Sequence, residues 1–240
     1  MRNYKEELEK RVEFIKNTLQ EARATGIVFG NSGGKDSALA GILCKIACEN
    51  TLGIMMPCES KRNFESDMQD AIKVAEKFKI ECITIDLTEA KHSIVKSVEK
   101  VENLSADATK NIPPRLRMTT VYAVAQSRNA LVCGTGNRSE TYMGYFTKWG
   151  DGGCDFNPIS DLTVTEIYEF LEFLEAPKEI IEKAPSAGLF EGQTDEQEMG
   201  ISYQEIDKFL LNGEKGENYL KIEKAHNATN HKRKLPKTYA

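Results

Sequence analysis

The sequence has no long apolar run, and its basic residues do not outnumber its acidic ones. No stretch of the 240 residues approaches the apolar length of a transmembrane helix, and the charged N-terminus lacks the apolar run of a signal peptide. We therefore expect no membrane partner and a cytoplasmic location. The net charge of −5 argues against a nucleic-acid partner, because phosphate contacts need a basic surface.

The cysteines include no C-x-x-C pair, and the chain shows no internal repeat or low-complexity segment. In a chain of this length such scattered cysteines indicate reduced, mostly buried thiols and neither a disulfide framework nor a zinc site. They are Cys44, Cys48, Cys58, Cys82, Cys133 and Cys154. A hydrophobic content of 40% and a charged content of 29% are typical of a globular protein.

Short apolar strands alternate with amphipathic helices through the first two thirds of the chain. We expect strands at 26–30, 52–56, 82–85 and 130–133, with helices at 4–22, 36–49, 65–78 and 118–128. This alternation predicts an α/β fold with a doubly wound parallel sheet flanked by helices. We expect one domain over residues 1–240, with a nucleotide-binding core at about 23–160. The remaining part, about 161–240, is expected to be helices and loops, with a helix starting at the capping-box spacing of Thr163 and Glu166.

The loop after the first expected strand reads G-N-S-G-G-K-D-S over residues 30–37. A Walker A loop fails here because Lys35 is followed by Asp36, and the glycine spacing does not match a dinucleotide fingerprint. The pattern S-G-G-x-D-S of the ATP pyrophosphatase (PP-loop) superfamily does match. The competing interpretation is a tight strand-to-helix turn that Asp36 caps.

The chemistry of this loop suits ATP. Paired glycines let backbone N–H groups approach a polyphosphate, and the following helix presents its positive end to the anion. A carboxylate beside phosphates is repulsive unless a cation lies between them, so Asp36 implies Mg²⁺.

Longer segments downstream resemble the signature stretches of NAD synthetases. They are G-T-G-N-R-S-E at 134–140, G-Y-F-T-K-W-G-D-G-G-C-D at 144–155, N-P-I at 157–159 and P-S-A-G-L-F-E-G-Q-T-D-E at 185–196. Further matches are M-G-I-S-Y-Q-E-I-D at 199–207, R-L-R-M at 115–118 and His231-Lys232. The resemblance covers the chain from the first strand onward.

The resemblance implies a two-step ligase reaction. The nicotinate carboxylate of deamido-NAD is adenylated by ATP with release of pyrophosphate, and ammonia then displaces AMP to give NAD. It also implies a homodimer. The residues it assigns to ATP are Gly30, Asn31, Ser32, Gly33, Gly34, Lys35, Asp36, Ser37, Thr135 and Ser186. Those assigned to deamido-NAD are Arg115, Lys148, Asp155, His231 and Lys232, and those assigned to Mg²⁺ are Asp36 and Glu140.

Several of these residues also have ordinary structural interpretations. Arg115 fits a solvated helix position, Lys148 and Asp155 fit an exposed pair beside a turn, and Glu140 fits a helix cap. The basic tail around His231 fits disordered charge.

The chain departs from the family pattern at three places. Val164 replaces a lysine that contacts ATP phosphate, and we hypothesise that Lys35 supplies the missing charge. Pro113-Pro114 replaces a Lys-Ala pair, which affects where Arg115 lies. No glutamine-hydrolysing domain is recognisable, so free ammonia is the expected nitrogen source unless a separate subunit delivers it. The alternatives are another PP-loop adenylating ligase and a non-catalytic ATP-binding sensor.

Overall fold

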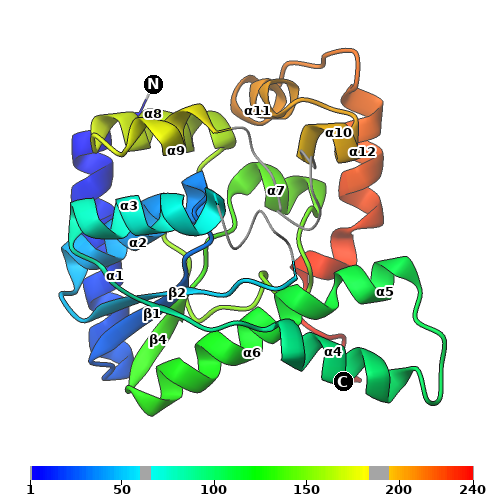
Figure 1. The fold of residues 1–240 in the computed structure, drawn as a ribbon. Helices are drawn as coiled ribbons and strands as arrows, with labels where there is room; N and C mark the ends of the chain where they lie inside the picture. The colour runs from blue at the N-terminus through cyan, green and yellow to red at the C-terminus, as the bar shows by residue number, and fades with distance from the viewer. Residues whose placement is uncertain (1, 60–65, 184–194, 240) are drawn as a thin grey trace.

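The fold is that of a computed structural model, which describes residues 2–59, 66–183 and 195–239. It contains a parallel sheet of four strands in the order β3-β2-β1-β4. The strands are β1 (Gly26–Gly30), β2 (Thr51–Met55), β3 (Glu81–Thr84) and β4 (Ala130–Cys133). Each lies within one residue of its predicted bounds, and the predicted parallel α/β architecture is confirmed (Figure 1).

The strand order reverses direction between β1 and β4. The chain runs outward from β1 to β2 and β3, and then returns to place β4 on the other side of β1. In open α/β sheets a crevice forms at such a reversal, beyond the carboxyl ends of the strands. The loops that follow β1 and β4 therefore meet at the position where a ligand is expected.

Helices surround the sheet and continue beyond it. They are α1 (Tyr4–Ala22), α2 (Lys35–Ala47), α3 (Met68–Phe78), α4 (Thr88–Val98), α5 (Ala106–Lys110), α6 (Ile112–Ser127), α7 (Arg138–Met143), α8 (Val164–Phe173), α9 (Lys178–Glu182), α10 (Asp195–Met199), α11 (Tyr203–Asn212) and α12 (Tyr219–Ala228). A short 3₁₀ turn, η2 (Asn230–Arg233), follows α12. No helix among the described residues combines the length and apolar character that a bilayer crossing requires.

The helix predicted to begin at residue 118 begins at Ile112, so that prediction was wrong at its N-terminus. Pro113 and Pro114 occupy the first turn of α6 and are buried there. Proline suits a first helical turn because its missing N–H has no partner within the helix and its backbone angle is already helical. The prolines therefore start this helix instead of preceding it.

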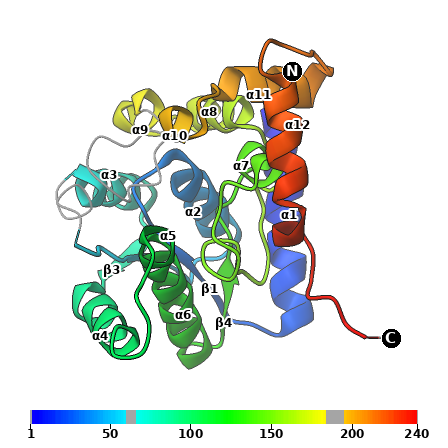
Figure 2. The same cartoon turned by 90° about the vertical axis from the view of Figure 1, so that its right-hand side faces the viewer.

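Alternate strand residues enter two cores on opposite faces of the sheet. Phe29 packs into a core with α1, α2, α3 and α8, whereas its neighbour Val28 packs into a core covered by α6. Figures 1 and 2 show α2 and α6 on the two sides of the strands. The period of two along a strand explains this division, since successive side chains point to opposite faces.

A third buried cluster lies beyond the sheet, among α7, α8, α11 and α12. Its members include Met143, Val164, Tyr203, Ile206 and Ile222. The helix α8 begins with the predicted capping box, in which Thr163 and Glu166 bond each other's backbone. This cluster places the C-terminal helices over the end of the sheet where the crevice opens (Figure 2).

Candidate functional site

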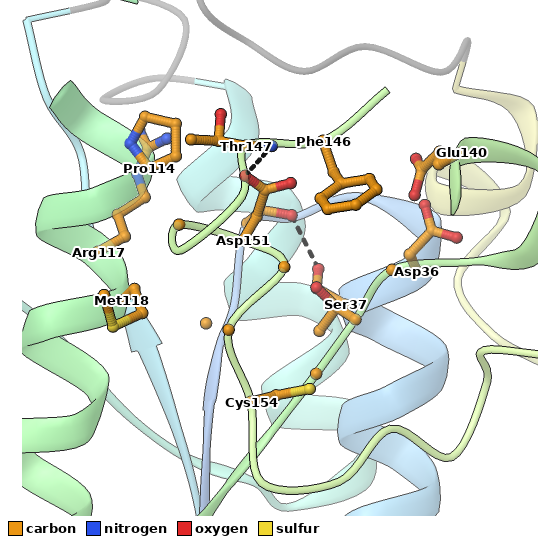
Figure 3. Close-up of a pocket in the computed structure, with 18 of the residues that line it drawn as sticks. Asp36, Ser37, Pro114, Arg117, Met118, Glu140, Phe146, Thr147, Asp151 and Cys154 are labelled. Carbon is orange, nitrogen blue, oxygen red and sulfur yellow. Dashed lines mark hydrogen bonds between the residues drawn. The ribbon is translucent and has the colours of Figure 1, made fainter. Parts of the chain in front are cut away.

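A cavity of about 820 Å³ opens at the carboxyl ends of β1, β2 and β4. It is lined by the loop after β1, the residues that follow β2 and β4, one face of α6, the segment after α7, and the C-terminal tail. Figure 3 shows carboxylates, an arginine and ring side chains from these segments facing a common space. The volume lies within the range of sites that hold nucleotide-sized ligands.

The loop after β1 forms an anion-binding turn at the start of α2. The backbone angle φ of Gly33 is positive, at 73°, and a hydrogen bond of 3.0 Å joins the hydroxyls of Ser32 and Ser37. The N-terminal cap residue of α2, Gly34, has no side chain to satisfy the first helical N–H groups. These N–H groups and hydroxyls are therefore donors for an anion at the helix end.

Two carboxylates from different segments meet at one side of the cavity. Asp36 lies in the first turn of α2 and Glu140 in α7, and Figure 3 shows their carboxyl groups facing each other. The amide of Asn137 donates to Asp36 at 2.9 Å, while its backbone N–H donates to Glu140 at 3.2 Å. The ammonium of Lys35 donates to the other oxygen of Asp36 at 2.8 Å. The pair is therefore held by an amide and one buried cation.

Burial and neighbouring charges of both signs shift the pKa values of Glu140 and Lys35. Burial raises the pKa of Glu140 well above its ordinary value, and the charge of Asp36 raises it further while Lys35 lowers it. For Lys35, burial disfavours the ammonium, but Asp36 and Glu140 outweigh that effect and raise its pKa. A divalent cation between the carboxylates would relieve their repulsion, and two carboxylates are donors that Mg²⁺ accepts alongside phosphates and water.

Asn137 was not assigned a role from the sequence, although a local signal for it existed. Its side chain accepts from the Glu140 N–H at 2.9 Å, so that Asn137 and Glu140 form a complete capping box on α7. Asparagine followed three residues later by glutamate is a capping-box spacing. The same bonds that begin α7 thus aim Glu140 at Asp36, and the structural and site interpretations of Glu140 are compatible.

The opposite side of the cavity is formed by one face of α6. Pro114, Arg117, Met118 and Val121 line it at helical spacing. Arg117 donates to the carbonyl of Met56 at 3.1 Å, and burial lowers its pKa. Because Pro114, Met118 and Val121 share this face at helical spacing, the sequence could have predicted that Arg117 lies on the same face.

Asp151 faces Arg117 across this part of the cavity (Figure 3). The N–H of Thr147 donates to the Asp151 carboxylate at 3.0 Å, and the surrounding protein atoms raise the pKa of this carboxyl group although the residue is exposed. Sequence reasoning did not single out Asp151, because nothing local distinguishes it from other acidic residues of the Gly-rich turn.

The residues that the resemblance assigns to deamido-NAD lie in two different places. Lys148 and Lys232 line the cavity, where Lys148 donates to the carbonyls of His231 and Lys234 and Lys232 donates to those of Gly144 and Phe146. These bonds hold the C-terminal tail against the segment after α7. His231 contributes only its carbonyl to this contact.

Arg115 and Asp155 do not line the cavity of their own chain. Arg115 is exposed on the outer side of α6, and its guanidinium lies 3.5 Å from the carbonyl of Lys148. Asp155 accepts from the hydroxyl of Tyr122 at 3.0 Å and from the N–H of Val132 at 2.8 Å. Both therefore lie on the side of the sheet that α6 covers, since Arg115 is on α6 and Asp155 accepts from a residue of α6 and a residue of β4.

Two of the residues that the resemblance assigns to ATP lie outside the loop after β1. Thr135 lines the cavity after β4, whereas Ser186 lies outside the described residues. Val164 is buried in the third cluster together with Tyr203, and the ammonium of Lys35 lies 5.6 Å from the centre of the Tyr203 ring. Lys35 and Val164 thus approach the same tyrosine from two elements.

The fold and the loop define the class of the protein. A parallel α/β sheet carries an S-G-G-x-D-S loop at its first strand, with a carboxylate facing it from the segment after β4. This is the arrangement of a nucleotide-binding protein of the PP-loop type.

Comparison with known proteins gives the family. The family model described as NAD synthase matches residues 7–236, and the chain belongs to this family. It is 44% identical over 238 residues to an NH(3)-dependent NAD(+) synthetase from Carboxydothermus hydrogenoformans, covering 98% of this chain and 97% of the relative.

Among solved structures, the chain resembles NMN synthetase from Francisella tularensis with a TM-score of 0.94 and 39% identity, over 100% of this chain and 99% of that one. It resembles NH3-dependent NAD synthetase from Campylobacter jejuni with a TM-score of 0.80 and 28% identity over both full lengths.

Proposed function

We propose that this protein is an ammonia-dependent ligase that amidates deamido-NAD to NAD at the expense of ATP. The observation that carries the proposal is the phosphate-binding loop with Asp36 facing Glu140, in a chain that belongs to the NAD synthase family. Relatives at 42–46% identity bear the name of ammonia-dependent NAD synthetases. The soluble substrates fit a cytoplasmic enzyme.

The reaction divides into two displacements. A carboxylate oxygen of the nicotinate ring attacks the α-phosphorus of ATP, and the bond to pyrophosphate breaks. Ammonia then attacks the carbonyl carbon of the adenylate, AMP leaves with the former carboxylate oxygen, and a proton passes to solvent. The chain contributes mainly by positioning: loop N–H groups and the Ser32 and Ser37 hydroxyls hold the phosphates while the cavity walls exclude water from the adenylate.

Asp36 and Glu140 are the residues that would hold Mg²⁺. When bound, the cation supplies neutralisation of the phosphate charge during adenylation. The buried repulsion between the two carboxylates supports this assignment, and Asn137 keeps both oriented toward the same space. The buried ammonium of Lys35 supports the hypothesis that it provides phosphate-side charge where Val164 cannot.

For the dinucleotide we propose a site shared by two copies of the chain. Lys148 and Lys232 line the cavity of their own chain, whereas Arg115 and Asp155 lie on the exposed side near β4. A homodimer formed along this edge would bring the second pair to the partner's cavity.

Complementation tests the shared site. Asp36→Ala and Asp155→Ala should each be inactive, and mixing them should restore about a quarter of wild-type activity, because half of the dimers are mixed and one of their two sites is intact. A mixture that stays inactive, although mixed dimers form, would refute the shared site.

The second candidate substrate is nicotinate mononucleotide, amidated by the same two steps. The observation that favours it is the TM-score of 0.94 to NMN synthetase from Francisella tularensis, against 0.80 for the ammonia-dependent NAD synthetase from Campylobacter jejuni. The ratio of kcat/KM for the dinucleotide and the mononucleotide decides between the two.

The assay uses purified protein with ATP, Mg²⁺, ammonium and either nicotinate substrate, and follows the amide product and AMP together. We expect equal amounts of both, lost in Asp36→Ala and retained in Glu49→Ala, which removes an exposed carboxylate just beyond the other end of α2. AMP without amide would indicate a different acceptor, as in another PP-loop ligase. ATP binding without turnover would support a sensor.

A further inference from the structure

The ammonium group of Lys183 joins the loop after β1 to the start of α3. Lys183 follows α9, and its side chain is 19% exposed. The ammonium donates to the carbonyl of Gly33 at 3.2 Å, to Asp67 at 2.9 Å and to Asp70 at 2.7 Å. Its own carbonyl accepts from the hydroxyl of Tyr168 in α8 at 2.8 Å. Both ends of the residue are therefore fixed.

The bond to Gly33 determines how the phosphate loop presents its backbone. In a trans peptide the carbonyl and the following N–H point in opposite directions. With the Gly33 carbonyl on Lys183, the Gly34 N–H faces the other way and donates to the Ser32 hydroxyl at 3.3 Å, and both Ser32 and Gly34 line the cavity. A rotation of this peptide would present a carbonyl oxygen to the phosphates, which is repulsive.

The surroundings of Gly33 make this conformation depend on α3. A Cβ added at Gly33 would lie 2.0 Å from the carbonyl oxygen of Asp67, so the loop backbone touches the start of α3 directly. The amide of Asn31 reaches the carbonyl of Ala71 in the same helix at 3.3 Å. A bare glycine with positive φ has a wide choice of conformations, and it therefore needs an outside contact to hold one of them.

We propose that Lys183 is a positioning residue that keeps the Gly33–Gly34 peptide oriented for phosphate binding. The inference rests on the proposed function only in taking the polyphosphate of ATP as the ligand of this loop. Asp67 and Asp70 hold the ammonium, the ammonium holds the Gly33 carbonyl, and the carbonyl sets the direction of the Gly34 N–H. Lys183 acts on the nucleotide through the loop.

The test compares two lysines that both connect the α3 and α9 region. Lys183→Met removes the contact to the loop, whereas Lys73→Met removes an ion pair between Lys73 and Glu179 that joins the same helices at the surface. We expect Lys183→Met to weaken MgATP and pyrophosphate binding about tenfold, as measured by calorimetry, because a charge-assisted hydrogen bond is lost. Lys73→Met should bind both ligands as the wild type does.

The kinetic readout separates positioning from a general loss of structure. Lys183→Met should raise KM for ATP about tenfold and leave KM for the nicotinate substrate unchanged. An equal rise in both constants, or an unchanged affinity for MgATP, would overturn the proposal. Calorimetry needs no turnover, so these outcomes remain readable even if the amidation reaction itself is wrong.

Asp70→Asn distinguishes positioning from direct phosphate contact. Asp70 does not line the cavity, and the amide would hold the Lys183 ammonium less tightly. We expect this variant to weaken MgATP binding in the same direction as Lys183→Met, by about threefold. If Lys183 contacted the phosphates directly, releasing it from Asp70 would leave binding unchanged or tighten it, and that result would refute the positioning role.

Discussion

Replacement of Lys35 by methionine should destabilise the protein through the carboxylates it leaves behind. Lys35 is 6% exposed and its ammonium lies 2.8 Å from Asp36, with Glu140 in the same buried group. Removing one partner of a buried ion pair costs about 3–5 kcal/mol, and we expect the lower end because the Asp36 side chain is 17% exposed. For a chain of this size about 3 kcal/mol corresponds to a fall in melting temperature of about 6–12 °C.

The loss should depend on pH and on Mg²⁺. Burial raises the folded-state pKa of Glu140 above its ordinary value of 4.5, so the folded state binds a proton at Glu140 more tightly than the unfolded state does. This contribution to stability is fully present below about pH 4.5. This contribution is lost as the pH rises through the folded-state pKa, so the deficit should be larger at about pH 8 than at about pH 5. A cation held by the two carboxylates should recover more stability in Lys35→Met than in the wild type.

Thermal melting with and without Mg²⁺ at the two pH values measures both effects. Lys10→Met is the matched control, because Lys10 pairs with Glu6 on the exposed side of α1 and its loss should leave the melting temperature unchanged. If Lys35→Met melts like the wild type, or if its deficit responds to neither pH nor Mg²⁺, the reasoning about the buried charge group is wrong.

Three further changes follow from single contacts. Gly33→Ala should cost at least about 1 kcal/mol from the left-handed backbone alone, and abolish MgATP binding, because the added methyl meets Asp67; melting and calorimetry measure these effects. Asn137→Ala should cost about 1–2 kcal/mol through the lost α7 cap and lower kcat/KM about tenfold by misaligning both carboxylates. Asp161→Asn should lower the melting temperature at neutral pH by only about 2–4 °C, because Asp161 is half exposed and solvent screens its ion pair with Arg11.

The Asp161 effect has a defined pH dependence. Burial alone would raise the pKa of Asp161, but the hydrogen bond and charge of Arg11 outweigh it, so the pKa lies below the ordinary 3.8. The stabilisation is therefore present above that value and disappears as the pH falls through the folded-state pKa. A difference between wild type and Asp161→Asn that persists in strong acid would contradict this assignment.

For Asn137→Ala, wild-type kinetics would contradict the proposed role of the Asn137 amide in orienting the two carboxylates.

Local sequence determined the framework of this protein. The alternation of strands and helices predicted the bounds of all four strands to within one residue. A short apolar run bounded by turn residues is typical of a strand buried in a parallel sheet. The S-G-G-x-D-S loop predicted the end of the sheet at which the cavity opens, and the spacing of Thr163 and Glu166 predicted the start of α8. These features depend on contacts between residues that are close in the chain.

Tertiary structure decided which side chains share the site. Asn137 meets Asp36 across 101 positions of the chain, and Lys183 meets Gly33 across 150. On α6, the rotation of the helix turned Arg117 into the cavity and Arg115 outward, although both stand in one short motif. Helix spacing states which residues share a face, but only packing against the sheet determines which face meets the ligand, because that choice minimises exposed apolar area over the whole chain.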